Sequence, residues 1–170
     1  MNTTPTITAG KGGKYLTFAL GREEYGLEIL KVREIIGYMD VTSVPGTPAH
    51  VKGVINLRGQ VISVMDLRSK FRMAEAAKTE QTCIVVVDIN RDGRRLNVGI
   101  VVDRVSEVLS IASDAIEEPP SFGQAIDAGF ILGMGKIGHS VKILLDIDRV
   151  MSTDQMAAVE ALSNETVGAA

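Results

Sequence analysis

The stretch that decides the fold is GVINLRGQVISVMDL, which covers residues 53–67. Two mostly apolar segments, 54–57 and 61–67, flank the dipeptide Arg58-Gly59. Because glycine readily takes the positive φ that a tight hairpin turn demands, this pattern predicts two antiparallel strands folded at the dipeptide. A single arginine in so apolar a hairpin also raises the question of what it binds.

The hairpin stretch recurs in the second half of the chain. There GMGKIGHSVKILLDIDRVM (133–151) aligns with GVINLRGQVISVMDLRSKF (53–71) at a shift of 80 residues. An upstream block repeats in the same order, since YGLEILKVREII (25–36) aligns with VGIVVDRVSEVL (98–109) at a shift of 73 residues. Two blocks in the same order in both halves indicate an internal duplication. We therefore expect two copies of one small, strongly bent β-unit.

The rest of the chain also has the pattern of short strands. Alternating or unbroken apolar runs predict further strands at 14–20, 24–29, 32–36, 83–89, 94–103, 130–138 and 140–147. Short strands with turn residues about every 8–12 positions favour small barrels, so the fold class is mainly β with one barrel per half. A contact between two barrels is a common place for a binding groove, and we expect one there.

The expected organisation is a flexible leader, two β lobes, a helix and a tail. The start of the chain is polar and Gly/Thr-rich, whereas an S-x-x-Q capping box followed by Met156, Val159 and Leu162 at helical spacing predicts the helix. The order of the repeats leaves open whether strands are exchanged between the lobes. The expected boundaries are 1–13 for the leader, about 14–81 and about 82–151 for the lobes, 152–164 for the helix and 165–170 for the tail.

Composition argues against two classes of function. The chain of 170 residues has 18 basic and 21 acidic residues, a net charge of −3, no Trp, three Tyr and four Phe. Nucleic-acid binding needs clustered Lys and Arg or stacking aromatics, so it is not expected. No apolar run approaches the roughly 20 residues of a membrane span, so direct membrane insertion is not expected either. The lone Cys83 cannot form an internal disulfide, which fits a reducing cytoplasm.

Residues that could carry chemistry are scattered rather than clustered. His50 and His139 are far apart and have no Cys or second His at metal-ligand spacing, and Cys83 lies inside a strand of the buried type. Asp66 and Asp146 occupy equivalent positions in the two copies, which favours a structural role, such as accepting backbone N–H groups at a chain reversal. We therefore expect no catalysis, no metal and no cofactor.

Arg58 is different because its counterpart in the second copy is Gly138, so the fold itself does not require an arginine there. An exposed turn arginine without a specific role is the plain alternative. Glu34 could pair with Arg58, but exposed ion pairs contribute only about 0–1 kcal/mol to stability. Arginine is enriched at binding hot spots, which favours recognition of a partner. A surrounding apolar patch, about half of which is expected to be core, would comprise Val32, Ile35, Val54 and Ile62.

At these residues the chain resembles a known family, the bacterial chemotaxis coupling proteins of the CheW type. The resemblance is carried by FALGREEYGLEILKVREIIGY (18–38), PGTPAHVKGVINLRGQVISVMDLRSKF (45–71) and VGIVVDRVSEVLSI (98–111), and it covers about residues 14–151. The Asn-Leu-Arg-Gly hairpin with its trailing Asp-Leu-Arg is specific. One departure is Ser63, where the family commonly has proline, and we expect this change to loosen the strand slightly.

The resemblance implies both a fold and a function. The fold would be two five-stranded SH3-like barrels, and the function would be that of a non-catalytic cytoplasmic adaptor in membrane receptor arrays. Its partners would be the cytoplasmic tip of methyl-accepting chemoreceptors and the regulatory domain of the histidine kinase CheA. The receptor-facing residues carried over from the family are Val32, Glu34, Ile35, Gly53 and Arg58, and no kinase-facing residue is placed. The rival interpretations are a small-molecule-binding or enzymatic β-barrel, and a nucleic-acid-binding barrel, against which the acidic balance argues.

Overall fold

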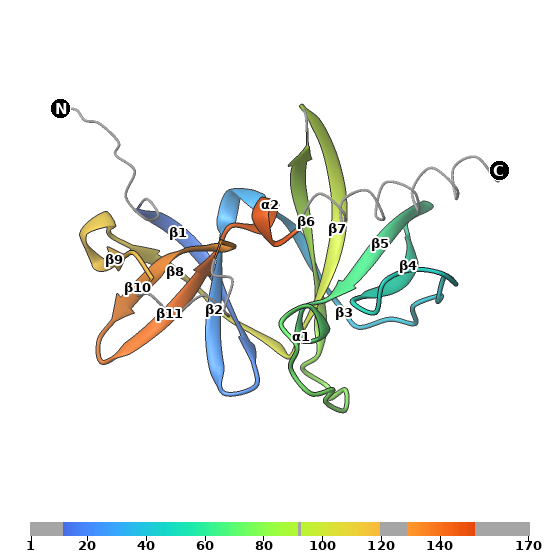
Figure 1. Ribbon diagram of the computed structural model, residues 1–170, viewed down its shortest axis with the longest axis horizontal. Coiled ribbons are helices and arrows are strands. Elements are labelled where there is room, and N and C mark those ends of the chain that lie inside the picture. The colour runs from blue at the N-terminus through green and yellow to red at the C-terminus, as the bar shows by residue number, and fades with distance from the viewer. Residues whose placement is uncertain (1–11, 92, 120–128, 152–170) are drawn as a thin grey trace.

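The computed structural model describes residues 12–91, 93–119 and 129–151 and shows a mainly β protein (Figure 1). The expected helix at 152–164, the tail at 165–170 and all but the last two residues of the leader lie outside the described residues. The strands are β1 (Gly13–Leu20), β2 (Glu23–Glu28), β3 (Val32–Gly37), β4 (Val51–Leu57), β5 (Gln60–Asp66), β6 (Cys83–Arg91), β7 (Arg94–Val102), β8 (Arg104–Ile111), β9 (Ile116–Glu117), β10 (Ile131–Ile137) and β11 (Ser140–Leu145). The helices are α1 (Leu67–Lys70) and α2 (Ile147–Val150), with 3-10 turns η1 (Ile29–Lys31) and η2 (Ser113–Ala115).

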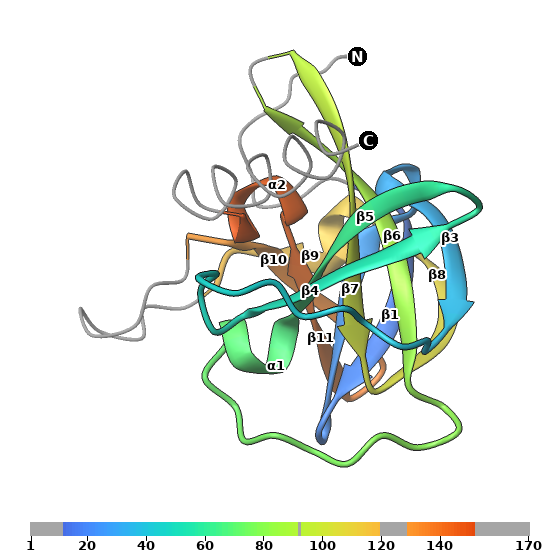
Figure 2. The ribbon, with the colours of Figure 1, turned by 90° about the vertical axis from the view of Figure 1, so that its right-hand side faces the viewer.

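The strands form two curved sheets that stand side by side (Figure 1). One, the six-strand lobe, has the order β8-β1-β2-β11-β10-β9, and the other, the five-strand lobe, has the order β3-β6-β7-β5-β4. The expectation of five strands per lobe therefore holds for one lobe, while the other has β9 as a sixth, two-residue strand at its edge. Figure 2 shows the β6–β7 hairpin extending beyond the body of its lobe.

Each lobe takes strands from both copies of the repeat. The six-strand lobe combines β1 and β2 of the first copy with β8 to β11 of the second. The five-strand lobe combines β3, β4 and β5 of the first copy with β6 and β7 of the second. The two sheets thus do not divide the chain near residue 81, where the order of the repeats placed the boundary. Instead, the copies exchange their first two strands reciprocally.

The duplication is visible in the strand register. In the six-strand lobe β2 runs parallel to β11 with Gly26 opposite Leu144, and in the five-strand lobe β7 runs parallel to β5 with Gly99 opposite Val64. The alignment of the repeats relates these two pairs to each other. A Cβ atom at Gly26 would lie 2.8 Å from the Leu144 side chain, and one at Gly99 would lie 2.7 Å from the Ile84 side chain. A Cβ atom at either position would therefore force a neighbouring side chain to shift.

The largest core lies between the two lobes rather than inside either of them. This central core contains buried side chains from both sheets, including Phe18 and Leu27 of the six-strand lobe and Val85 and Ile100 of the five-strand lobe. Smaller buried clusters fill the interiors of the two lobes. The contact between the lobes is therefore mainly a packed core.

Two one-turn helices replace the ends of two predicted strands. The strands stop before Leu67 and Ile147, where α1 and α2 begin. Asp66 and Asp146 precede these helices, and each side chain accepts a backbone N–H hydrogen bond from the helix that follows, at 3.0 Å in α1 and 3.1 Å in α2. Such capping satisfies donors that a helix end would otherwise leave unpaired. The structural role predicted for this pair of aspartates is confirmed.

Candidate protein-binding site

The β4–β5 hairpin turns at Arg58-Gly59, as the sequence predicted. Leu57 pairs with Gln60 across the turn, and both turn residues have positive φ, 52° for Arg58 and 87° for Gly59. Positive φ at both positions is the geometry of a type I′ hairpin turn. The side-chain oxygen of Asn56 accepts a hydrogen bond from the Gly59 N–H group at 2.8 Å, which stabilises the turn.

Arginine is an unfavourable residue for the conformation that Arg58 adopts. A non-glycine residue in the left-handed region costs roughly 1–2 kcal/mol. The equivalent residue of the second copy is Gly138, with a φ of 59°, which carries no such cost. The first copy therefore has an arginine where its sister has the residue better suited to the backbone. Strained residues of this kind cluster at functional sites.

Arg58 forms an ion pair with Glu34 of β3, the pairing considered in the sequence analysis. The guanidinium donates a hydrogen bond from Nη2 to Oε2 of Glu34. The Arg58 side chain is 70% exposed and that of Glu34 is 30% exposed. This hydrogen bond holds the pKa of Glu34 below its usual value and raises the pKa of Arg58, so both groups are charged at neutral pH. Because the pair is so exposed, its contribution to stability is small.

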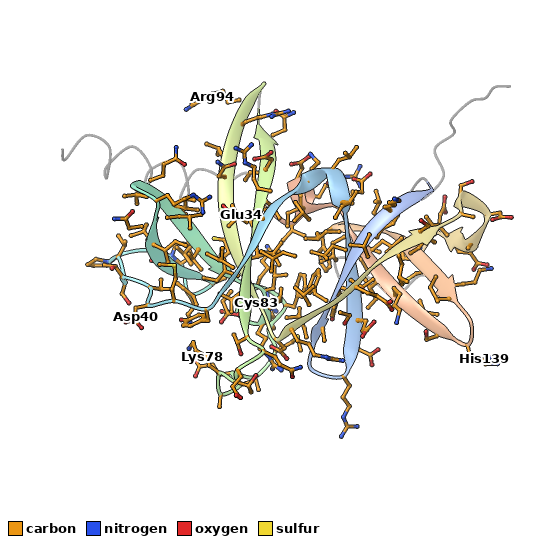
Figure 3. The ribbon with its side chains drawn as sticks, turned by 180° about the vertical axis from the view of Figure 1, so that it is seen from behind. Glu34, Asp40, Lys78, Cys83, Arg94 and His139 are labelled. Carbon is orange, nitrogen blue, oxygen red and sulfur yellow. The ribbon has the colours of Figure 1, made fainter. Side chains whose placement is uncertain are left out.

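The ion pair spans the open end of the five-strand lobe. Glu34 lies opposite Val86, and Ile36 lies opposite Ile84, and both partners belong to the core inside this lobe. Residues opposite each other in a sheet share a face, so the Glu34 side chain leaves β3 on the inner face of the lobe. Figure 3 shows Glu34 beside the β6–β7 hairpin. A shallow depression opens there, lined by the ion pair together with Leu57, Gln60 and Asn97.

The other two candidates on β3 lie on the opposite face of the strand. A β-bulge between Val32 and Glu34 shifts the alternation, so that Val32 lies opposite Val87 and Ile35 lies opposite Val85. Both of these partners belong to the central core. Val32 is partly buried against that core, whereas Ile35 is 45% exposed. The structure thus separates an apolar pair facing the contact between the lobes from the charged pair at the end of one lobe.

Gly53 has a structural explanation in the fold. Its φ is 144°, and a Cβ atom there would lie 1.9 Å from the backbone oxygen of Thr42. Thr42 forms a bridge to Val54 through two backbone hydrogen bonds of 2.9 Å each. Any side chain at Gly53 would displace this segment. Gly53 therefore presents no side chain to a partner, and it determines the path of the chain around Thr42.

The apolar patch predicted around Arg58 divides between core and surface. Ile62 is only 4% exposed inside the five-strand lobe, and Val54 packs against the central core. Ile35 is the most exposed of the predicted patch residues. Val61, the second residue of β5 after the hairpin turn, is 40% exposed and was not among the predicted patch residues.

The exposed apolar residues Ile35 and Val61 each align with an exposed apolar residue of the second copy. Ile35 aligns with Val108, and Val61 aligns with Val141. All four side chains are 40–49% exposed. An apolar residue at the same exposed position in both copies indicates that the two lobes present surfaces of a similar kind.

Groups with metal-binding chemistry do not cluster in the described part of the chain. No group of three or more His, Cys, Asp or Glu side chains there could hold a metal ion. His50 precedes β4 in the five-strand lobe, and burial lowers its pKa, whereas His139 lies in the β10–β11 turn of the other lobe (Figure 3). Cys83 is buried, which raises the pKa of its thiol. None of the helices described is long and apolar enough to cross a membrane.

The fold and the site define a class of protein, a duplicated two-lobe β scaffold whose copies exchange strands around a shared core. The chain belongs to the CheW family, because the family model of the CheW-like domain matches residues 14–155. It is 42% identical over 149 residues to the chemotaxis protein CheW of Klebsiella aerogenes, covering 88% of this chain and 87% of that protein. It is 33% identical over 143 residues to the chemotaxis protein CheW of Treponema pallidum, covering 83% of each.

A solved structure has the same fold. The crystal structure of the scaffolding protein TtCheW from Thermoanaerobacter tengcongensis matches with a TM-score of 0.73 and 33% sequence identity, covering 85% of this chain and 95% of that chain. The resemblance to CheW stated from the sequence and the mainly β fold of two SH3-like lobes are both confirmed.

Proposed function

We propose that this chain is a non-catalytic chemotaxis adaptor that couples methyl-accepting chemoreceptors to the histidine kinase CheA. Membership of the CheW family supports this function, as do the names of the relatives, which are chemotaxis proteins and a scaffolding protein. The adaptor works in the cytoplasm and reaches membrane receptor arrays through its partners. The observation that carries the proposal is the exposed, strained Arg58 at a turn where the second copy has Gly138.

In this proposal the receptor tip binds along β3, which is an edge strand of its sheet. The exposed Ile35 and the partly buried Val32 offer apolar surface to a receptor helix, in the manner of a helix laid into a groove. Gly53 acts only by holding the backbone of β4 against the neighbouring segment. The apolar contacts supply affinity, and the register of the helix comes from the charged pair at the end of the lobe.

Arg58 is suited to set that register. It has five N–H donors, of which the described contacts direct one to Glu34, and its guanidinium is 70% exposed. Carboxylate or backbone oxygens of a receptor helix could accept the others in charge-assisted hydrogen bonds. Because Glu34 already orients the guanidinium, less side-chain freedom is lost when the receptor binds.

Control of the kinase requires a second set of contacts. We place these on the two lobes, since the regulatory domain of CheA would present barrels of the same kind, and we assign no single kinase-facing residue. A receptor can change kinase activity only if its contacts with the adaptor differ between the active and inactive arrangements of the complex.

The substitution Arg58→Gly tests the receptor role separately from folding. Glycine removes the guanidinium but suits a φ of 52°, so the free energy of unfolding should stay constant or rise by about 1 kcal/mol. Affinity for a purified receptor cytoplasmic fragment, measured by calorimetry, should fall by about tenfold or more, as for a hot-spot residue. Affinity for CheA should remain within about twofold of wild type.

The matched control is Arg22→Gly, because Arg22 is an exposed arginine in the β1–β2 turn of the other lobe. It should change neither stability nor receptor affinity appreciably. If Arg58→Gly binds the receptor fragment as tightly as wild type, the receptor role of this residue is refuted. If the wild-type protein binds neither a receptor fragment nor CheA, the adaptor function itself is refuted.

A further inference from the structure

Two ion pairs tie the copies of the repeat together across the contact between the lobes. In the first, the Arg68 clasp, Arg68 of α1 donates to both carboxylate oxygens of Asp103, with Nε–Oδ1 and Nη2–Oδ2 distances of 2.9 and 2.6 Å. The backbone N–H group of Gly21 donates to the same carboxylate at 2.7 Å. The Arg68 and Asp103 side chains are 17% and 31% exposed. Arg68 belongs to the first copy and Asp103 to the second.

The second contact, the Asp148 clasp, has the same construction with the charges reversed. Asp148 of α2 accepts hydrogen bonds from Lys31 Nζ at 2.8 Å and from the backbone N–H group of Asn90 at 2.9 Å. The Lys31 and Asp148 side chains are 28% and 31% exposed. Lys31 belongs to the first copy and Asp148 to the second, so this clasp also joins the two copies.

The alignment of the repeats places the two clasps at equivalent positions to within one residue. Arg68 corresponds to Asp148, and the junction at residues 30–31 corresponds to the junction at residues 103–104. The one-turn helix therefore supplies the cation in one clasp and the anion in the other. The first copy has no carboxylate at its own junction, because the residue aligned with Asp103 is Leu30, which is 92% exposed.

The reciprocal exchange of strands gives the first copy two candidate partners. It pairs with the second copy of its own chain, but the shared strand register would also let it pair with the first copy of another chain. In that like-copy pairing Arg68 would lose Asp103 and meet Leu30 and Lys31 instead. A partly buried guanidinium would then face an apolar residue and a like charge, which is unfavourable.

We propose that this arrangement of charge keeps the strand exchange within one chain. The first copy carries cations both on its helix, at Arg68, and at its junction, at Lys31. It is therefore complementary to the second copy and not to itself. When the first copy pairs with the second copy, both clasps form. When the first copies of two chains pair with each other, neither clasp forms.

The substitution Leu30→Asp tests this proposal, because it gives the first copy a carboxylate where the second copy has Asp103. Leu30 is 92% exposed, so the folded monomer should tolerate the change. Full-length protein is refolded from urea at about 1 µM to about 1 mM, a range that reaches the effective concentration of covalently linked units. Size-exclusion chromatography with light scattering then measures the dimer fraction. We expect a several-fold larger dimer fraction than for wild type, and a decrease of that excess at high salt.

The matched control is Leu30→Asn, which has nearly the same shape without the charge and should refold like wild type. Equal dimer fractions for the Asp and Asn variants at every concentration would overturn the proposal. A second variant, Lys31→Asp with Asp148→Arg, keeps an ion pair within the chain and leaves the net charge unchanged. It should also dimerise more than wild type, because its first copies have an acid at the junction to pair with Arg68. If this variant folds and its dimer fraction equals that of wild type, the proposal is overturned as well.

Discussion

Replacement of Gly53 by alanine asks whether this residue acts through the fold or through contact with a partner. The new Cβ atom would lie 1.9 Å from the Thr42 backbone oxygen, and alanine is itself strained at a φ of 144°. We expect the Thr42 segment to detach from β4, with loss of the two backbone hydrogen bonds to Val54. The strain costs about 1–3 kcal/mol, and the loss of the two hydrogen bonds costs about 1–3 kcal/mol together. The free energy of unfolding should therefore fall by about 2–6 kcal/mol.

Thermal and urea denaturation measure this change. For a chain of this size each kcal/mol shifts the melting temperature by about 2–4 °C, so a loss near 4 kcal/mol lowers it by about 8–16 °C. Gly37→Ala is the matched control, because a Cβ atom at Gly37, also in a strand of the five-strand lobe, has nothing within 4 Å. If Gly53→Ala is within about 1 kcal/mol of this control, the structural explanation is refuted. Any loss of receptor binding in that variant would then indicate direct contact.

Three further changes test other parts of the structure. Hydrogen bonds from Arg68 hold the pKa of Asp103 below its ordinary value, so the stability this pairing contributes is present at neutral pH and lost as the pH falls through the folded-state pKa. Urea titrations from about pH 7 to pH 3 should therefore show a shallower decline for Asp103→Asn than for wild type, and parallel declines would contradict the pairing. Asp146→Ala should lower the free energy of unfolding by about 1 kcal/mol because α2 loses its cap, and an unchanged urea midpoint would exclude that role. Leu67→Ala should cost about 2–5 kcal/mol because Leu67 is fully buried in the central core, whereas Leu30→Ala, at a 92% exposed position, should cost no more than about 0.5 kcal/mol; similar costs for both would refute the placement of the core.

Most strands could be predicted because alternation and turn residues are local signals. The hairpin at Arg58-Gly59 follows from them, whereas the duplication follows from the alignment of the two halves of the chain. The predicted strand ended at Asp103 and β8 was missed, because Asp103 alone stands between β7 and β8 and no glycine or proline marks the bend. The exchange of strands could not be predicted, because alternation shows which face a residue occupies and not which strand lies beside it.

The candidate site was predictable in part for the same reason. The pairing of Glu34 with Arg58 could be suggested because the repeats place their strands in neighbouring blocks. The β-bulge after Val32 could not be predicted. One extra residue in the strand changes the face of every residue before it, and the apolar pattern of the sequence fits both arrangements. The need for Gly53 comes from the approach of Thr42, which is a contact that a local pattern does not reveal.

The strand exchange has a consequence for cleavage of the chain. Residues 72–82, which connect the two copies, are mostly exposed and contain no strand or helix. A protease cut there would sever the polypeptide and yet release neither fragment, because β1 and β2 would stay hydrogen-bonded to β8 and β11, and β3 and β5 to β6 and β7. The nicked protein would therefore persist as a complex of two fragments, each of which supplies part of both lobes.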